Sequence, residues 1–109
     1  MKVANRVKKY EEFQKIINEG SLIRNDSFNA YYLKNTTKLS RFGISIPKKS
    51  GNAVVRNRIK RQIRAAISAS CDMTIPFDIV LIARKNYDIE NYSKTLADVV
   101  DVIKKVGQK

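Results

Sequence analysis

Residues 51–69 read GNAVVRNRIKRQIRAAISA, and the spacing of apolar and basic side chains in this stretch predicts the central element of the fold. Apolar side chains recur in it every three to four residues and would form one stripe along a helix: Val55, Ile59, Ile63, Ala66 and Ile67. An advance of 100° per residue places the basic side chains of the same stretch on the opposite side. The stretch therefore predicts a helix with one side in a core and a continuous cationic band on the other.

The cationic band contains no acidic residue, whereas solvated helix surfaces normally interleave glutamate with lysine. Arginine predominates in it, and the planar guanidinium group can grip two phosphate oxygens, or a phosphate and a base edge. This chemistry favours a structured nucleic acid as the partner. The polar members of the band are Arg56, Asn57, Arg58, Lys60, Arg61 and Arg64.

The absence of acid extends well beyond this helix, over residues 27–71, which we call the acid-free segment. The rest of the chain is nearly balanced, with twelve basic and ten acidic residues. Uncompensated cations repel one another in a compact state, so their concentration indicates a polyanionic partner. The ten basic residues of the segment are Lys34, Lys38, Arg41, Lys48, Lys49, Arg56, Arg58, Lys60, Arg61 and Arg64.

Composition limits the function further. The 109 residues, 43% of them hydrophobic, suit one domain (1–109) with a modest core. The chain has no histidine, which removes the commonest general base and metal ligand, and the lone Cys71 is expected to be inert. Asp98 and Asp101 could share the outer, solvated face of a helix. We therefore expect no catalytic residue and no metal site in the protein.

No apolar run approaches the roughly 20 residues that a membrane-spanning helix needs, and the N-terminus lacks the apolar stretch of a signal peptide. We therefore expect a cytoplasmic protein with no membrane partner.

The segments before the basic helix predict one helix and two strands. Helical spacing of Tyr10, Phe13, Ile16 and Ile17 predicts a helix over 8–19, which Gly20 would end. Alternation over 27–34 predicts a strand with apolar residues on both faces, and alternation over 39–46 predicts a second strand. The polar link 35–38 suggests that these two strands form a hairpin.

The C-terminal part predicts a buried strand and a last helix. Residues 77–83 form a nearly unbroken apolar run, as in a strand covered on both faces. A helix is predicted over 91–106, with Asn91 as its N-cap. The predicted fold class is α+β: a small central sheet of about four strands packed with three helices, in the order helix, two or three strands, helix, strand, helix.

One long motif is similar to a known family. The run Arg41-x-Gly43-x-Ser45-x-x-Lys48-Lys49-x-Gly51-x-Ala53-Val54-x-Arg56-Asn57-Arg58-x-Lys60-Arg61-x-x-Arg64 resembles the signature of the bacterial ribonuclease P protein subunit. Residues 6–13 resemble the start of that family, and residues 78–85 resemble its fourth strand.

The resemblance implies a protein partner of a catalytic RNA that removes the 5′ leader from precursor tRNA. In that family the RNA performs the hydrolysis with magnesium, which it holds mainly together with the substrate, so the chain would be a ribonuclease P holoenzyme subunit without protein catalytic residues. The partners implied are the RNA subunit and precursor tRNA, with no DNA. The residues that would contact the RNA subunit are Lys48, Arg56, Asn57, Arg58, Lys60, Arg61 and Arg64.

The resemblance also implies a cleft between the first helix and the sheet that holds the single-stranded leader. Its lining positions here are Phe13, Ile17, Tyr31, Ser45 and Lys49, with Ile17 where the family commonly has a second aromatic residue. The fold implied resembles a ribosomal-protein domain with a left-handed crossover between parallel strands. The link 70–76 is short for the family.

The residues alone leave two other functions open. A ribosomal or other structural RNA-binding protein would share the charge and fold but need no leader cleft. A metal-dependent nuclease that acts without RNA is the third reading.

Overall fold

The structure is a computed structural model, and it describes residues 6–70 and 75–108. Cys71 and most of the 70–76 link therefore lie outside the described residues. Three helices and four strands are present, as the fold class predicted. The elements are α1 (Tyr10–Glu19), β1 (Ser21–Arg24), β2 (Phe28–Lys34), β3 (Arg41–Ser45), the 3-10 turn η2 (Lys48–Ser50), α2 (Ala53–Ser70), β4 (Phe77–Ala83) and α3 (Tyr92–Gly107).

The four strands form one mixed sheet in the order β1-β2-β4-β3. Strand β4 pairs antiparallel with β2 and parallel with β3, so it is central, as its apolar run predicted. The predicted hairpin between β2 and β3 is wrong, because β4 lies between them and β2 instead pairs with β1. A strand buried on both faces needs a neighbour on each side, and β2 and β3 are those neighbours.

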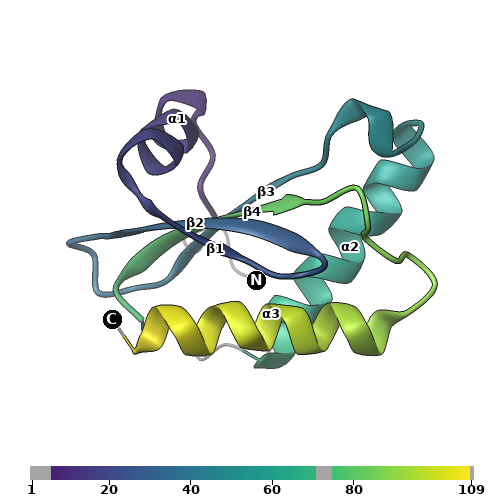
Figure 1. Cartoon of the computed structure of the whole chain (residues 1–109). Coiled ribbons are helices and arrows are strands. Elements are labelled where there is room, and N and C mark those ends of the chain that lie inside the picture. Colours follow the sequence, from purple (N-terminus) through teal and green to yellow (C-terminus); the bar gives the residue numbers. More distant parts are fainter. Residues whose placement is uncertain (1–5, 71–74, 109) are drawn as a thin grey trace.

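The sheet separates two layers of helices (Figure 1). Helices α2 and α3 cover one face and α1 covers part of the other. Strands β3 and β4 are parallel neighbours joined through α2, and the left-handed course of this crossover stays a prediction from the resemblance.

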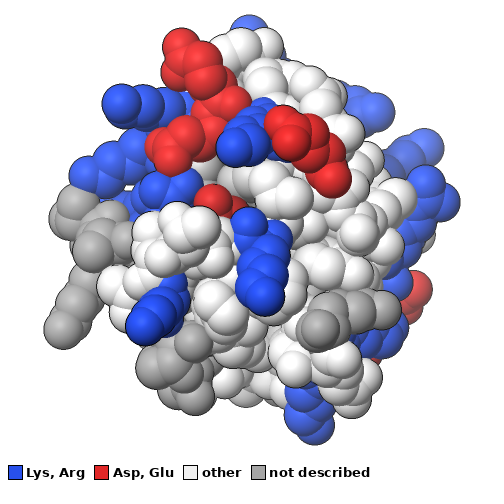
Figure 2. All heavy atoms as spheres, turned by 90° about the vertical axis from the view of Figure 1, so that its left-hand side faces the viewer, with Lys and Arg blue, Asp and Glu red and all other residues white. Residues whose placement is uncertain are grey.

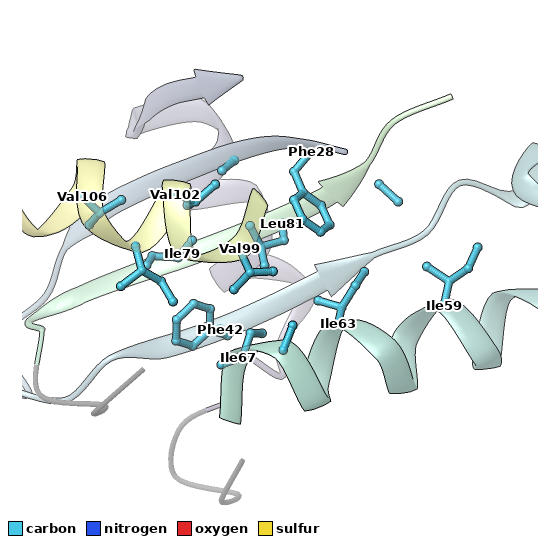
Figure 3. Packing of buried hydrophobic residues seen from close by; sticks show 14 of the residues in the cluster. Phe28, Phe42, Ile59, Ile63, Ile67, Ile79, Leu81, Val99, Val102 and Val106 are labelled. Carbon is cyan, nitrogen blue, oxygen red and sulfur yellow. The ribbon is translucent and has the colours of Figure 1, made fainter. Parts of the chain in front are cut away.

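The main core lies between the sheet and the pair α2 and α3 (Figure 3). Ile63 and Ile67 of the predicted apolar stripe are fully buried there, and they meet Phe42 of β3 and Val99 of α3. A smaller cluster on the opposite face joins Val7, Ile16 and Val80. The two-faced alternation predicted for β2 is confirmed, since Phe28 and Ala30 face the main core while Tyr31 packs against the smaller cluster.

Helix α1 begins at Tyr10, two residues later than predicted, and it ends before Gly20 as expected. Tyr10 is 73% exposed and so does not belong to the buried side of α1. Helix α3 is confirmed with its cap, because the Asn91 side chain accepts a hydrogen bond from Lys94 N.

The solvated face predicted for Asp98 and Asp101 is only part of their environment, because both also accept hydrogen bonds from another element, while the Asp101 side chain stays 37% exposed. Asp98 accepts a 2.5 Å hydrogen bond from Ser27 Oγ, and Asp101 accepts one of 3.2 Å from Asn25 Nδ2. These carboxylates fasten α3 to the turn between β1 and β2. Within the described residues, no helix is both long and apolar enough to cross a membrane.

Candidate nucleic-acid interface

The start of helix α2 is built by two residues with distinct roles. Gly51 has a φ of 148°, which only glycine adopts without strain, and a Cβ there would lie 2.9 Å from the Val55 side chain. Asn52 then caps the helix, because its side-chain oxygen accepts a 3.0 Å hydrogen bond from Val55 N. The basic turn Lys48–Ser50 is thereby set at the beginning of the cationic helix.

The cationic band of α2 lies on the side away from the core, as predicted. Asn57, Arg58 and Arg61 are exposed, whereas Arg56, Lys60 and Arg64 are half-buried along the flank. Arg58 approaches Glu90 at 3.6 Å, but both side chains are largely exposed and such a pair contributes little.

A small pocket continues the band toward the edge of β3. Its volume is about 100 Å³, and Lys60 and Arg64 line it together with Arg6. The segment that carries Arg6 is held beside β3, because Val7 N donates a 2.9 Å hydrogen bond to the Phe42 carbonyl. The Nε atoms of Arg6 and Arg64 are buried, and the described residues offer them no hydrogen-bond partner.

Sequence reasoning did not assign Arg6 to the interface. Residues 6–13 were noted only for their resemblance to the start of the family, and nothing local shows that the segment pairs with β3.

Two of the predicted leader residues, Tyr31 and Ser45, share the sheet face beneath α1. Tyr31 and Gly43 are the neighbours of Val80 on either side, and Ser45 is the neighbour of Ile82. The Phe13 ring lies directly on β3, since a Cβ at Gly43 would be 2.7 Å from two of its ring atoms. Phe13 and Tyr31 both pack against the smaller cluster, and Ile17 is half-buried on α1.

A hollow of about 620 Å³ lies where the parallel strands β3 and β4 end. Lys49 lines it, so this predicted residue sits near Ile82 but away from the small pocket that Phe13 lines. No acidic residue lines the hollow, and the sequence-based prediction missed two of its cations, Arg84 and Lys85. They lie outside the acid-free segment, where charge counting gave no signal.

The wall of this hollow is anchored by the neighbouring polar residues. The Tyr87 hydroxyl donates to Gln62 Oε1 on α2 at 2.8 Å and accepts from Thr95 Oγ1 on α3 at 3.0 Å. Burial raises the pKa of the Tyr87 phenol, which keeps it protonated and able to donate. The Arg84 guanidinium donates to the Asn25 carbonyl at 2.8 Å.

Arg41 differs from the other cations of the motif, because two carboxylates bind its guanidinium. Its Nε lies 2.9 Å from Asp78 Oδ1 and its Nη2 lies 2.5 Å from Glu12 Oε2. Burial disfavours the Arg41 charge, but the hydrogen bonds to Asp78 and Glu12 outweigh it and raise the pKa of Arg41. The hydrogen bond from Arg41 likewise lowers the pKa of Glu12 against the opposing effect of burial.

Several acidic side chains gather on the part of the surface where α1 lies. Figure 2 shows them at the top of the face that it draws, with basic side chains beside and between them. Helix α1 carries Glu11, Glu12 and Glu19. A polyanion is therefore attracted to the sheet end and to α2.

Among residues 6–70 and 75–108, no three acidic or cysteine side chains gather. Glu12 and Asp78, whose carboxylates meet at Arg41, already bind that guanidinium. Magnesium is usually held by one or two carboxylates together with phosphate oxygens, so the place of the ion stays a prediction from the resemblance.

Comparison with known proteins agrees with the motif. The sequence model of the family described as "Ribonuclease P" matches residues 1–107. The chain is 41% identical to the ribonuclease P protein component of Streptococcus agalactiae over 107 residues, 98% of each chain. It is 38% identical to that of Mycoplasma mycoides over 108 residues, 97% of this chain and 99% of the relative.

Two solved structures share the fold. The RNase P protein of Staphylococcus aureus has a TM-score of 0.79 at 34% identity, covering 92% of this chain and 93% of that chain. The RNase P protein of Thermotoga maritima has a TM-score of 0.81 at 28% identity, covering 92% of this chain and 96% of that chain.

Proposed function

Because this chain belongs to the ribonuclease P protein family and is thus a subunit that partners ribonuclease P RNA, we propose that it binds the 5′ leader of precursor tRNA and assists its removal. The observation that carries the proposal is that one compact domain-sized chain presents two distinct cationic surfaces, one on α2 and one at the sheet end. Two surfaces suit two RNA strands.

The α2 surface is the proposed contact with the RNA subunit. Arg56, Arg61 and Arg64 project from one rigid helix, and the Arg6 pocket extends it. Guanidinium groups held on a helix can bind successive phosphates of a folded RNA without a large loss of conformational entropy.

The sheet face beside α1 is the proposed leader site. Phe13 and Tyr31 offer aromatic surface on which bases can stack regardless of sequence, at about 1–3 kcal/mol per base. Lys49, Arg84 and Lys85 around the neighbouring hollow would bind the phosphates of the same strand. Ser45 and Ile17 would complete the lining.

We assign the chemistry to the RNA subunit. The described residues carry no histidine and no cluster of carboxylates, so the protein supplies binding and electrostatics. A bound magnesium ion would supply Lewis-acid stabilisation of the charge that develops in the reaction. In this proposal the RNA subunit and the substrate hold the ion.

The test is reconstitution with a bacterial ribonuclease P RNA. The protein should raise leader cleavage at low magnesium, and the holoenzyme should bind precursor tRNA more tightly than mature tRNA. Failure to stimulate cleavage at any magnesium concentration would refute the proposal. Cleavage by rigorously RNA-free protein would instead support a stand-alone nuclease.

Substitution of Phe13 and Tyr31 by alanine tests the leader site itself. A selective loss of affinity for precursor tRNA is expected, because mature tRNA has no leader to stack on these rings. An equal loss for both tRNAs would indicate the alternative of a general structural RNA-binding protein, which no comparison favours.

A further inference from the structure

Arg41 lies in the most basic part of the sequence, yet its surroundings do not suit an RNA phosphate. Asp78 binds the guanidinium through two oxygens, at 2.9 and 3.2 Å, and Glu12 binds it at 2.5 Å. The two carboxylates outweigh the single positive charge, and they accept from the three N–H donors of Nε and Nη2, out of the five that a guanidinium has. The net negative charge of the three groups disfavours a phosphate beside them.

The two carboxylates reach Arg41 from different layers of the molecule. Asp78 is its direct neighbour across the parallel pair β3 and β4, and Asn35 Nδ2 also holds Asp78 at 2.8 Å. Glu12 comes from α1, on the layer above the sheet. The Glu12–Arg41 contact is therefore a tie between helix and sheet, whereas the Arg41–Asp78 contact lies within the sheet.

Glu12 also helps to begin α1. Its Oε1 atom accepts a hydrogen bond of 3.4 Å from Lys9 N, while its Oε2 atom accepts from Arg41. The same carboxylate thus caps the first turn of the helix and fastens that turn to β3.

Phe13 follows Glu12 directly, so the tie determines where its ring lies. The ring rests on Gly43, which is two residues after Arg41 and hence on the same face of the same strand. Movement of the first turn of α1 would carry the ring away from β3 and change the width of the space beside Tyr31.

We propose that Glu12 and Arg41 are positioning residues for the leader: their ion pair holds the first turn of α1 so that Phe13 is presented at the spacing that the leader strand requires. This inference rests on the proposed leader site. Arg41 acts through Glu12 and Phe13 and makes no contact with RNA phosphate.

The decisive variant is Glu12→Gln, compared with Glu11→Gln in the reconstituted holoenzyme. Glutamine can still cap the helix but carries no charge for Arg41. Glu11 is the exposed neighbour on the same helix, so its substitution changes the net charge equally. We expect E12Q to lower the preference for precursor over mature tRNA about two- to fivefold, the range for loss of a partly exposed ion pair, and E11Q to leave it unchanged.

Arg41→Lys is the second variant, because lysine keeps the charge but cannot bind both carboxylates as a planar fork. We expect R41K to lose precursor preference like E12Q, with unchanged affinity for the RNA subunit and unchanged salt dependence of that affinity.

Three results would overturn the inference: equal behaviour of E12Q and E11Q, a parallel loss of precursor, mature tRNA and RNA-subunit binding, or a shallower salt dependence in R41K. The last would identify Arg41 as a phosphate contact. A wild-type holoenzyme that does not prefer precursor tRNA would instead refute the leader site, and so separates the two proposals.

Discussion

Gly43 shows how little space separates α1 from the sheet. A Cβ at this position would lie 2.7 Å from the Cε1 and Cζ atoms of Phe13 and 3.3 Å from the Val7 side chain. We therefore predict that Gly43→Ala displaces the Phe13 ring. Unfolding free energy should fall by about 1–3 kcal/mol, as for other overpacked sites, and precursor tRNA should bind more weakly to the holoenzyme.

Gly107→Ala is the matched control, because the chemical change is identical. A Cβ at Gly107 would meet only Ile75, at an ordinary 3.8 Å, and alanine favours a helix over glycine by up to about 1 kcal/mol. Stability should be unchanged or slightly higher. Denaturant unfolding measures both variants, and a G43A protein as stable as G107A would show that α1 yields without cost.

Arg41, in the same neighbourhood, has contacts that the sequence alone did not predict. Arg41 was counted among the cations of the acid-free segment and of the motif without a role of its own, and its partners lie 29 and 37 positions away in the sequence. Contacts over such separations follow from strand order and helix placement. A local pattern of charge predicts where cations are, but not which of them the protein neutralises itself.

Helix α2 carries the prediction that belongs to a whole element. Each phosphate contact releases condensed counterions, so removing one contact should reduce the steepness of the salt dependence of RNA binding by about 0.7–0.9 in a log–log plot. We expect this change for Arg56→Ala, Arg61→Ala and Arg64→Ala, measured as RNA-subunit affinity over a salt series.

Lys104→Ala serves as the control for α2. Lys104 is an exposed residue in the last turn of α3, so the variant loses the same charge from a different surface. Its salt dependence should match that of the wild type. Unchanged slopes in all three α2 variants would place the RNA contact elsewhere on the protein.

Elements with a complete local pattern were predicted well. A few neighbouring residues were enough to predict three features: the apolar stripe of α2, the buried run of β4 and the Asn91 cap of α3. Strand β1 has a weak pattern because three of its four residues are exposed. Without β1, the partner of β2 appeared to be the next strand in sequence, and the hairpin prediction failed for that reason.

The charge of the whole molecule follows from these elements. Three acidic residues lie on α1, while β2, β3 and α2 contain none, and Arg41 of β3 is paired with Glu12 and Asp78. The sequence alone predicted that acidic and basic residues occupy different segments of the chain. Only the fold shows that cations gather along α2 and in the hollow beside its start, while α1 lies on the other face of the sheet from α2.

This distribution predicts that ionic strength stabilises the free protein. A net charge of +12 is confined within 35 × 27 × 24 Å, and the Debye length of about 30 Å at 0.01 M salt leaves that repulsion nearly unscreened. At 0.1 M the Debye length falls to about 10 Å, so the melting temperature should rise with sodium chloride over this range. For a domain near this size, about 1 kcal/mol corresponds to roughly 4–8 °C.

Two substitutions locate the source of the effect. Arg61 has Arg58 and Arg64 three residues away on either side, so Arg61→Gln should raise the melting temperature at low salt and weaken its salt dependence. Lys104 has Asp101 three residues before it, so Lys104→Gln removes an attraction and should not stabilise the protein.

Both variants lose one positive charge, so equal effects would mean that net charge alone governs stability. A melting temperature that falls with salt would contradict the repulsion itself. If R61Q alone stabilises, the cationic band is held in the free protein against its own electrostatic cost, as expected of a surface that a polyanion neutralises.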